Sequence, residues 1–333
     1  MTPSRLLVLA LCALAVIGGA AWLSSQRHLE RSIDAGALFL PGLQQAVNEV
    51  TEIRIAQAGN RAVTLRREAN GWRVAERKFA ADGGAVRKLL LDLAQLRVIE
   101  QKTSDPKRYA ALGVEPLSLS TAAGTELALN AAGRSWSLVL GKSVAPDRIY
   151  ARLTAAQDSF LVSPEPAHDA TPGRWLDTRL LDISSDRVKS VTIERSGSAA
   201  YTVARATAKD VGFSVAPLPK GRRLTADTAA APIVEALVDL RLEDVHAAAD
   251  AASPPPATAT YTTFDGLVLK IAGRQEAQLQ AIRISASAAA GSSAEIASAA
   301  RELEQRSAGL EFDLPQYKYS AIFKPLEELL QSR

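Results

Sequence analysis

The sequence predicts an α+β protein, with an N-terminal transmembrane helix followed by two diverged copies of a mostly antiparallel β module, each with one principal packed helix. Three observations lead to this class. An uncharged apolar run occupies residues 6–23, alternating apolar and polar residues follow it, and a strand–helix pattern at 71–98 returns at 212–242. The length of 333 residues leaves room for two domains that each bury a core.

The composition is that of a globular protein, since 47% of the residues are hydrophobic and 23% are charged. The 39 basic and 36 acidic residues give a net charge of +3 and are interspersed along the chain. We therefore expect no concentrated basic surface and no nucleic-acid partner. Cys12 lies in the apolar run, so the rest of the chain can form neither an internal disulfide nor a thiolate metal site.

The first element is the apolar run Leu6–Leu23, eighteen residues without a charge. As a helix it spans roughly 27 Å, close to the thickness of a bilayer core. We expect residues 1–5 to form a cytoplasmic tail, 6–23 a transmembrane anchor and 24–47 a juxtamembrane connector. A cleaved signal peptide remains the alternative, with Gly19-Ala20-Ala21 as the cleavage region, although the run exceeds the usual ~7–15 apolar residues.

The first β module is expected at residues 48–180. Strands are predicted where Ile53 and Ile55, Val63 and Leu65, and Trp72 and Val74 alternate with polar residues. A helix follows Asp82, with an apolar stripe of Val86, Leu89, Leu90, Leu93 and Leu96. Further strands are predicted at 117–120, 126–130, 135–140, 149–153 and 160–162.

The second module is expected at 181–333. Three alternating runs precede a helix after Asp227 that carries Ile233, Leu237 and Leu240. "LAQLRVIE" from Leu93 aligns with "LVDLRLED" from Leu237, and "TELALNAAGR" at 125–134 resembles "DGLVLKIAGR" at 265–274. Such internal similarity favours two copies of one module. An exposed helix within 293–307 and an amphipathic C-terminal helix at 322–330 complete the prediction.

The motif Gly141-Lys142-Ser143 resembles the end of a phosphate-binding loop. That loop needs a glycine where this chain has Trp136, and the following residues predict a turn and a strand instead of a helix. We therefore expect no nucleotide.

Other chemistry has no clear signature. His28, His168 and His246 lack a second ligand at metal-site spacing, so no metal or cofactor is expected. A carboxylate pair such as Asp82 with Glu115 leaves a hydrolase open as an alternative, because two acids can come from any part of a chain. No feature selects this pair over others.

Four blocks of sequence resemble the domain-of-unknown-function family 4340: "ALFLPGLQQAVNEVTEIRI" (37–55), "FAADGGAVRKLLLDLAQLRVIEQKTSDPKRYAALGVE" (79–115), "RWLDTRLLDISSDRVKSVTI" (174–193) and "LPQYKYSAIFKPLEELL" (314–330). The resemblance extends over nearly all of the chain beyond the anchor. It implies a membrane-anchored accessory protein of gliding-type ABC transport systems, whose ATPase and permease are separate chains. It supplies no catalytic residues.

These observations predict a non-enzymatic, membrane-anchored, extracytoplasmic scaffold or accessory component of an ABC-type transport or envelope complex. We expect a single-pass protein of the bacterial inner membrane, held by residues 6–23, with most of the chain in the periplasm. Its partners are expected to be a transporter permease or other envelope proteins. Lys102, Lys107, Arg108 and Tyr109 are the candidate contact residues. An envelope enzyme and a periplasmic ligand-binding module remain alternatives.

Overall fold

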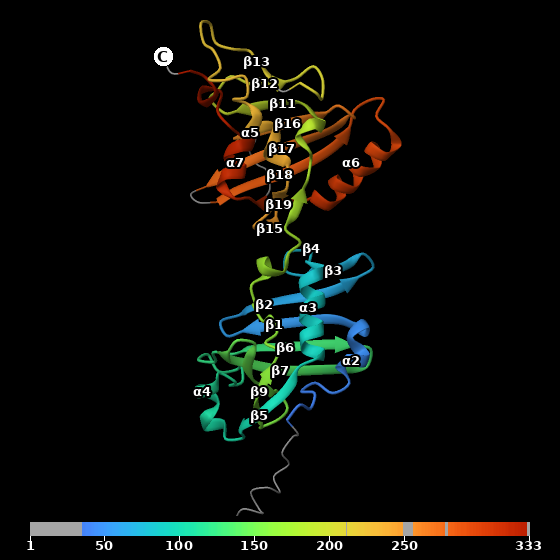
Figure 1. Cartoon of the computed structure of the whole chain (residues 1–333), viewed down its shortest axis with the longest axis vertical. Coiled ribbons are helices and arrows are strands. Elements are labelled where there is room, and N and C mark those ends of the chain that lie inside the picture. The colour runs from blue at the N-terminus through green and yellow to red at the C-terminus, as the bar shows by residue number, and fades with distance from the viewer. Residues whose placement is uncertain (1–34, 211, 249–255, 277–278, 332–333) are drawn as a thin grey trace, which may run out of the picture. The chain divides into compact units, whose positions relative to one another are not determined.

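The computed structural model shown in Figure 1 describes residues 35–210, 212–248, 256–276 and 279–331. The chain divides into two compact units, of which the second comprises Arg73–Asp82 and Pro172–Arg333 and the first comprises the rest. Mostly antiparallel sheets with short helices build these units, which confirms the α+β class. The expected anchor at 6–23 lies outside the described residues. Among the described helices, none has the length and apolar character needed to cross a membrane.

The first sheet has nine strands, in the order β4-β3-β2-β1-β6-β7-β8-β9-β5. Alternation explains why these residues form strands, since Ile53 and Ile55 of β1 are buried while Arg54 between them is exposed. The strands are β1 (Val50–Gln57), β2 (Arg61–Glu68), β3 (Gly71–Val74), β4 (Phe79–Ala80), β5 (Arg97–Thr103), β6 (Thr125–Ala131), β7 (Arg134–Ala145), β8 (Arg148–Leu153) and β9 (Ser159–Ser163).

Helix α3 (Gly83–Ala94) lies across one face of this sheet (Figure 1). Its buried residues include Val86, Leu89, Leu90 and Leu93, so the predicted apolar stripe is confirmed. The expected connector 24–47 needs correction, because its last part is folded into the first unit. Short helices α2 (Leu43–Ala46) and η1 (Val47–Glu49) lead into β1, and Phe39, Leu40 and Leu43 are buried because they are large and apolar.

The second sheet has eight strands, in the order β13-β12-β11-β16-β17-β18-β19-β15. Leaving β4 aside, this is the strand order of the first sheet, position by position. The strands are β11 (Val188–Arg195), β12 (Tyr201–Ala204), β13 (Ser214–Ala216), β15 (Asp244–Ala247), β16 (Ala257–Thr263), β17 (Leu267–Glu276), β18 (Leu279–Ala288) and β19 (Leu310–Asp313). A separate pair is formed by β10 (Arg179–Leu181) and β14 (Leu240–Arg241).

The two sheets agree in detail as well as in order. The register of β1 against β6 shifts between Val50 and Glu52, and that of β11 against β16 shifts between Val188 and Ser190, at the same place in each strand. One predicted correspondence is wrong, because 125–134 begins in β6 whereas 265–274 lies mainly in β17, which occupies the position of β7. Period-two alternation is common to all strands, so short matches between neighbouring strands arise easily.

The helices of the second unit differ from the prediction. The helix expected at 227–240 is reduced to α5 (Ala231–Val234) and one 3-10 turn, η5 (Glu235–Leu237). Pro232 lacks an N–H and fits only the first turn, so the helix cannot begin earlier. The principal helix of this unit is instead α6 (Ala294–Ser307), the one predicted at 293–307 and capped by Ser293.

Several smaller elements complete the described fold. The C-terminal helix expected at 322–330 is reduced to the 3-10 turn η6 (Leu326–Leu329) after Pro325, and α7 (Gln316–Ile322) ends where that helix was expected to begin. The strand expected at 117–120 is a turn. The remaining short helices are η2 (Pro106–Arg108), α4 (Tyr109–Leu112), η3 (Pro172–Trp175) and η4 (Ser185–Arg187).

Candidate functional site

Residues 104–122, which we call the cover segment, lie over the outer face of the first sheet. Val139 stands between Leu138 and Leu140 of β7, so it points to the face opposite theirs. There it forms a small separate core with Tyr109 and Val114 of the cover segment, joined by the partly buried side chains of Leu112, Leu117 and Tyr150. The cover segment therefore has a packing role that the sequence pattern did not indicate.

A buried arginine holds the cover segment in place. Arg152 of β8 is 4% exposed, and its Nε donates a hydrogen bond to the carbonyl of Val114 at 2.9 Å. Its Nη1 donates to three further carbonyls, those of Leu153, Thr154 and Ala156. The guanidinium carbon also lies 4.9 Å from the ring centroid of Tyr109, a cation–π arrangement. One cation thus joins the segment to the sheet through backbone groups and an aromatic ring.

The motif Gly141-Lys142-Ser143 supports this packing. A Cβ at Gly141 would lie 2.2 Å from the carbonyl oxygen of Leu112, so only glycine permits the approach. Lys142 Nζ donates to the carbonyls of Ala110 and Ala111 at the end of α4, and Ser143 Oγ donates to Glu165. All three motif residues lie within β7, and Gly141 and Lys142 serve the contact between this strand and the cover segment.

The four candidate contact residues are placed differently from one another. Lys107 and Arg108 are exposed on η2, and neither side chain forms an ion pair with another described residue. Lys102 on β5 pairs with Glu100 at 2.6 Å. Tyr109 is 5% exposed and its hydroxyl donates to the carbonyl of Gln157, so its ring belongs to the small core and is not available to a partner.

The acids considered as a catalytic pair are not equivalent. Glu115 is 8% exposed, and its Oε2 has no hydrogen-bond partner among the described residues. Asp82 is exposed and belongs to the second unit, where its backbone N–H donates to the carbonyl of Trp175. In the part of the chain that the structure describes, no group of three or more His, Cys, Asp or Glu side chains could hold a metal ion.

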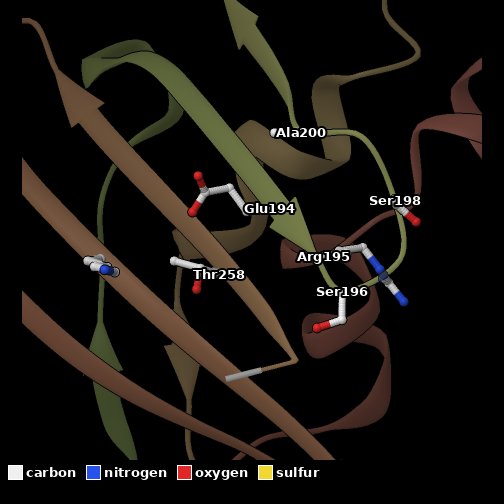
Figure 2. A pocket seen from close by; sticks show the side chains of 7 residues that line it. Glu194, Arg195, Ser196, Ser198, Ala200 and Thr258 are labelled. Carbon is white, nitrogen blue, oxygen red and sulfur yellow. The ribbon is translucent and has the colours of Figure 1, made fainter. Parts of the chain in front are cut away.

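The second unit carries an open hollow of about 400 Å³ on the outer face of its sheet, shown in Figure 2. Glu194 and Arg195 come from β11, Thr258 from β16 and Lys270 from β17, while Ser196, Ser198 and Ala200 come from the turn before β12. No sequence motif marked this site, because its residues are ordinary strand and turn positions that become neighbours only when β11, β16 and β17 pair.

Opposite charges face solvent in this hollow. Neither Glu194 nor Lys270 forms an ion pair or side-chain hydrogen bond with another described residue. They lie on strands separated by β16 and are offset by two residues along the strand direction, which places their Cα atoms roughly 12 Å apart. Arg195 differs, since its Nη1 donates to the carbonyl of Phe323. The hollow therefore offers one anion, one free cation and several hydroxyl groups.

The fold defines a class of protein: an α+β chain with two mostly antiparallel sheets of the same strand order. The family model described as "Domain of unknown function (DUF4340)" matches residues 72–260, more than half of the chain. The chain belongs to this family, as its sequence resemblance predicted. The matched range is shorter than that resemblance, since the blocks at 37–55 and 314–330 lie outside it. Comparisons with curated proteins and with solved structures found no match.

Proposed function

We propose that this protein is a non-enzymatic scaffold or accessory component of an ABC-type transport or envelope complex, anchored in the bacterial inner membrane through residues 6–23. Most of the chain would lie in the periplasm as two diverged copies of one module. The observation that carries the proposal is the cover segment, which Arg152 and Gly141 hold firmly while it presents Lys107 and Arg108 without ion-pair partners among the described residues. Cations on a rigid support suit the recognition of an acidic protein surface.

The contact is tested with the double variant Lys107→Glu, Arg108→Glu. Reversing two rim charges should weaken association, so recovery of membrane-protein partners with the full-length chain should fall roughly fivefold or more. The measurement is co-purification from detergent-solubilised membranes after crosslinking. A matched control is Arg61→Glu with Arg87→Glu, two exposed positions elsewhere in the first unit. Equal recovery with both double variants would remove the cover segment as the contact.

A second candidate function is ligand binding, which the hollow around Glu194 and Lys270 favours. Its separated opposite charges and hydroxyl groups suit a small zwitterion with an ammonium and a carboxylate group. For a dipeptide such as glycylglycine, we expect Lys270→Gln to weaken binding about tenfold, the loss of one charge-assisted hydrogen bond. Calorimetry measures this, with the exposed Lys189→Gln as control. No heat of binding to the unaltered protein would exclude this function.

A further inference from the structure

The loop that follows β13 in the second unit carries three cations, Lys220, Arg222 and Arg223. We call residues 217–226 the basic loop. Lys220 and Arg223 are exposed, and neither side chain forms an ion pair or a hydrogen bond with another described residue. Leu218, which precedes them in the loop, is 39% exposed. The loop therefore presents two cations and one apolar side chain to solvent.

The backbone of the basic loop is fixed at two places. The amide of Arg222 donates to the carbonyl of Pro219 at 3.0 Å and closes a turn in which Gly221 has a φ of 74°, a conformation that favours glycine. Leu224 then forms an antiparallel bridge with Leu330 near the C-terminus. The exposed side chains thus stand on an ordered support, which lowers the entropy cost of binding a partner.

The third cation holds the loop and is not available to a partner. Arg222 Nη2 donates to the carbonyl of Gln331 at 2.8 Å, and its Nη1 lies 3.5 Å from Glu327 Oε2. The backbone amide of Gln331 in turn donates to the carbonyl of Arg223 at 2.9 Å. This division of roles leaves Lys220 and the Arg223 side chain as the two cations that can bind a partner.

The matching strand orders identify a counterpart of the basic loop. β13 has the position in the second sheet that β3 has in the first, when β4 is left aside. "GFSVA" at 212–216 also aligns with "GWRVA" at 71–75. The residues that follow this block in the first copy, 76–81, are therefore the shorter counterpart of the basic loop.

This counterpart binds a carboxylate. Within the second unit, Arg77 donates from Nε and Nη2 to the two oxygens of Asp244, at 2.7 and 2.8 Å. The ring of Phe79 in the same segment packs edge-on against Phe312, with 5.6 Å between the ring centroids. A loop at this place in the module thus supplies a cation for a carboxylate and an apolar side chain for an apolar neighbour. The basic loop carries the same two kinds of side chain in exposed positions.

We propose that the basic loop is a docking element for an acidic segment of a partner protein. Lys220 and Arg223 bind carboxylates of that segment, and Leu218 contacts an apolar side chain between them. A second copy of this chain suits the loop less well. Glu100, which aligns with Asp244, already pairs with Lys102 at 2.6 Å, so the corresponding carboxylate is engaged.

The test uses the acidic pentapeptide EEFEE, labelled with fluorescein, and the full-length protein in a non-ionic detergent. Fluorescence anisotropy measures binding, with the neutral peptide QQFQQ as reference. Reversing both charges in Lys220→Glu, Arg223→Glu should weaken binding of EEFEE roughly tenfold, as expected for the loss of two exposed ion pairs. The matched control is Lys189→Glu, Arg301→Glu, the same charge change at two exposed positions of the second unit. Equal weakening in both double variants, or no binding to the unaltered protein, would overturn the proposal.

The contact is located by carbodiimide crosslinking, which joins a peptide carboxylate to a lysine Nζ. Mass spectrometry should find Lys220 as the main crosslinked lysine of the second unit, and the crosslink should persist in Lys107→Glu, Arg108→Glu. This contact and that of the cover segment are thereby tested separately. Leu218→Ser should weaken binding of EEFEE but not of EEAEE, and thermal unfolding confirms that each variant is folded. Crosslinks spread evenly over Lys220 and other exposed lysines such as Lys209 would count against a specific contact.

Discussion

Replacing Arg152 with methionine is expected to lower the free energy of unfolding of the first unit by about 3 kcal/mol. Methionine keeps most of the apolar stem but removes every donor, so the carbonyls of Val114, Leu153, Thr154 and Ala156 lose this partner inside the protein. The stacking on Tyr109 is lost as well. Urea unfolding of the full-length protein in detergent, followed by tryptophan fluorescence, measures the loss.

The matched control for this prediction is Arg148→Met, an exposed arginine at the start of the same strand. Its effect should stay within about 0.5 kcal/mol, as for most surface substitutions. Limited proteolysis gives a second readout, since the cover segment should be cut faster only in Arg152→Met. Equal stability of the two variants would show that the segment is held mainly by the small core around Val139.

Replacing Gly141 with alanine is expected to destabilise the first unit by roughly 2–3 kcal/mol. The added Cβ would meet the carbonyl oxygen of Leu112 at 2.2 Å and Val114 Cγ1 at 2.9 Å, so the cover segment must move away from β7. This is a steric effect, because the backbone of Gly141 is not in the left-handed region. The same urea titration measures it.

Gly83→Ala is the control for this substitution. Gly83 begins α3, and an added Cβ there meets nothing within 4 Å. Alanine should therefore stabilise the helix by about 0.5–1 kcal/mol, since it restricts the unfolded chain. If both variants were equally stable, the steric conflict expected from the close approach of α4 to β7 would be contradicted.

Local patterns predicted much of the fold. Alternating residues such as Ile53, Arg54 and Ile55 indicated strands, and the stripe beginning at Val86 indicated α3, because burial on one face leaves a period in the sequence. The same reasoning overestimated the helix after Asp227. There Pro232 limits where a helix can begin, and Leu240 is buried as part of a strand.

The candidate sites were less accessible to sequence reasoning. Lys107 and Arg108 are exposed, but the prediction also included Tyr109, which is buried. A tyrosine in a polar stretch of sequence has no feature that separates a buried ring from a surface ring. Whether such a ring is buried depends on what folds over it. Here Val139 and Arg152, thirty or more residues further along the chain, provide that burial.

The sequence alone determined the α+β class and the membership in the DUF4340 family, because each rests on patterns that extend over many residues. Only the tertiary structure decided which isolated side chains meet. Arg77 binds Asp244 because the turn between β3 and β4 adjoins β15 in the second unit. Contacts between residues so distant in sequence depend on strand order, and no local period encodes it.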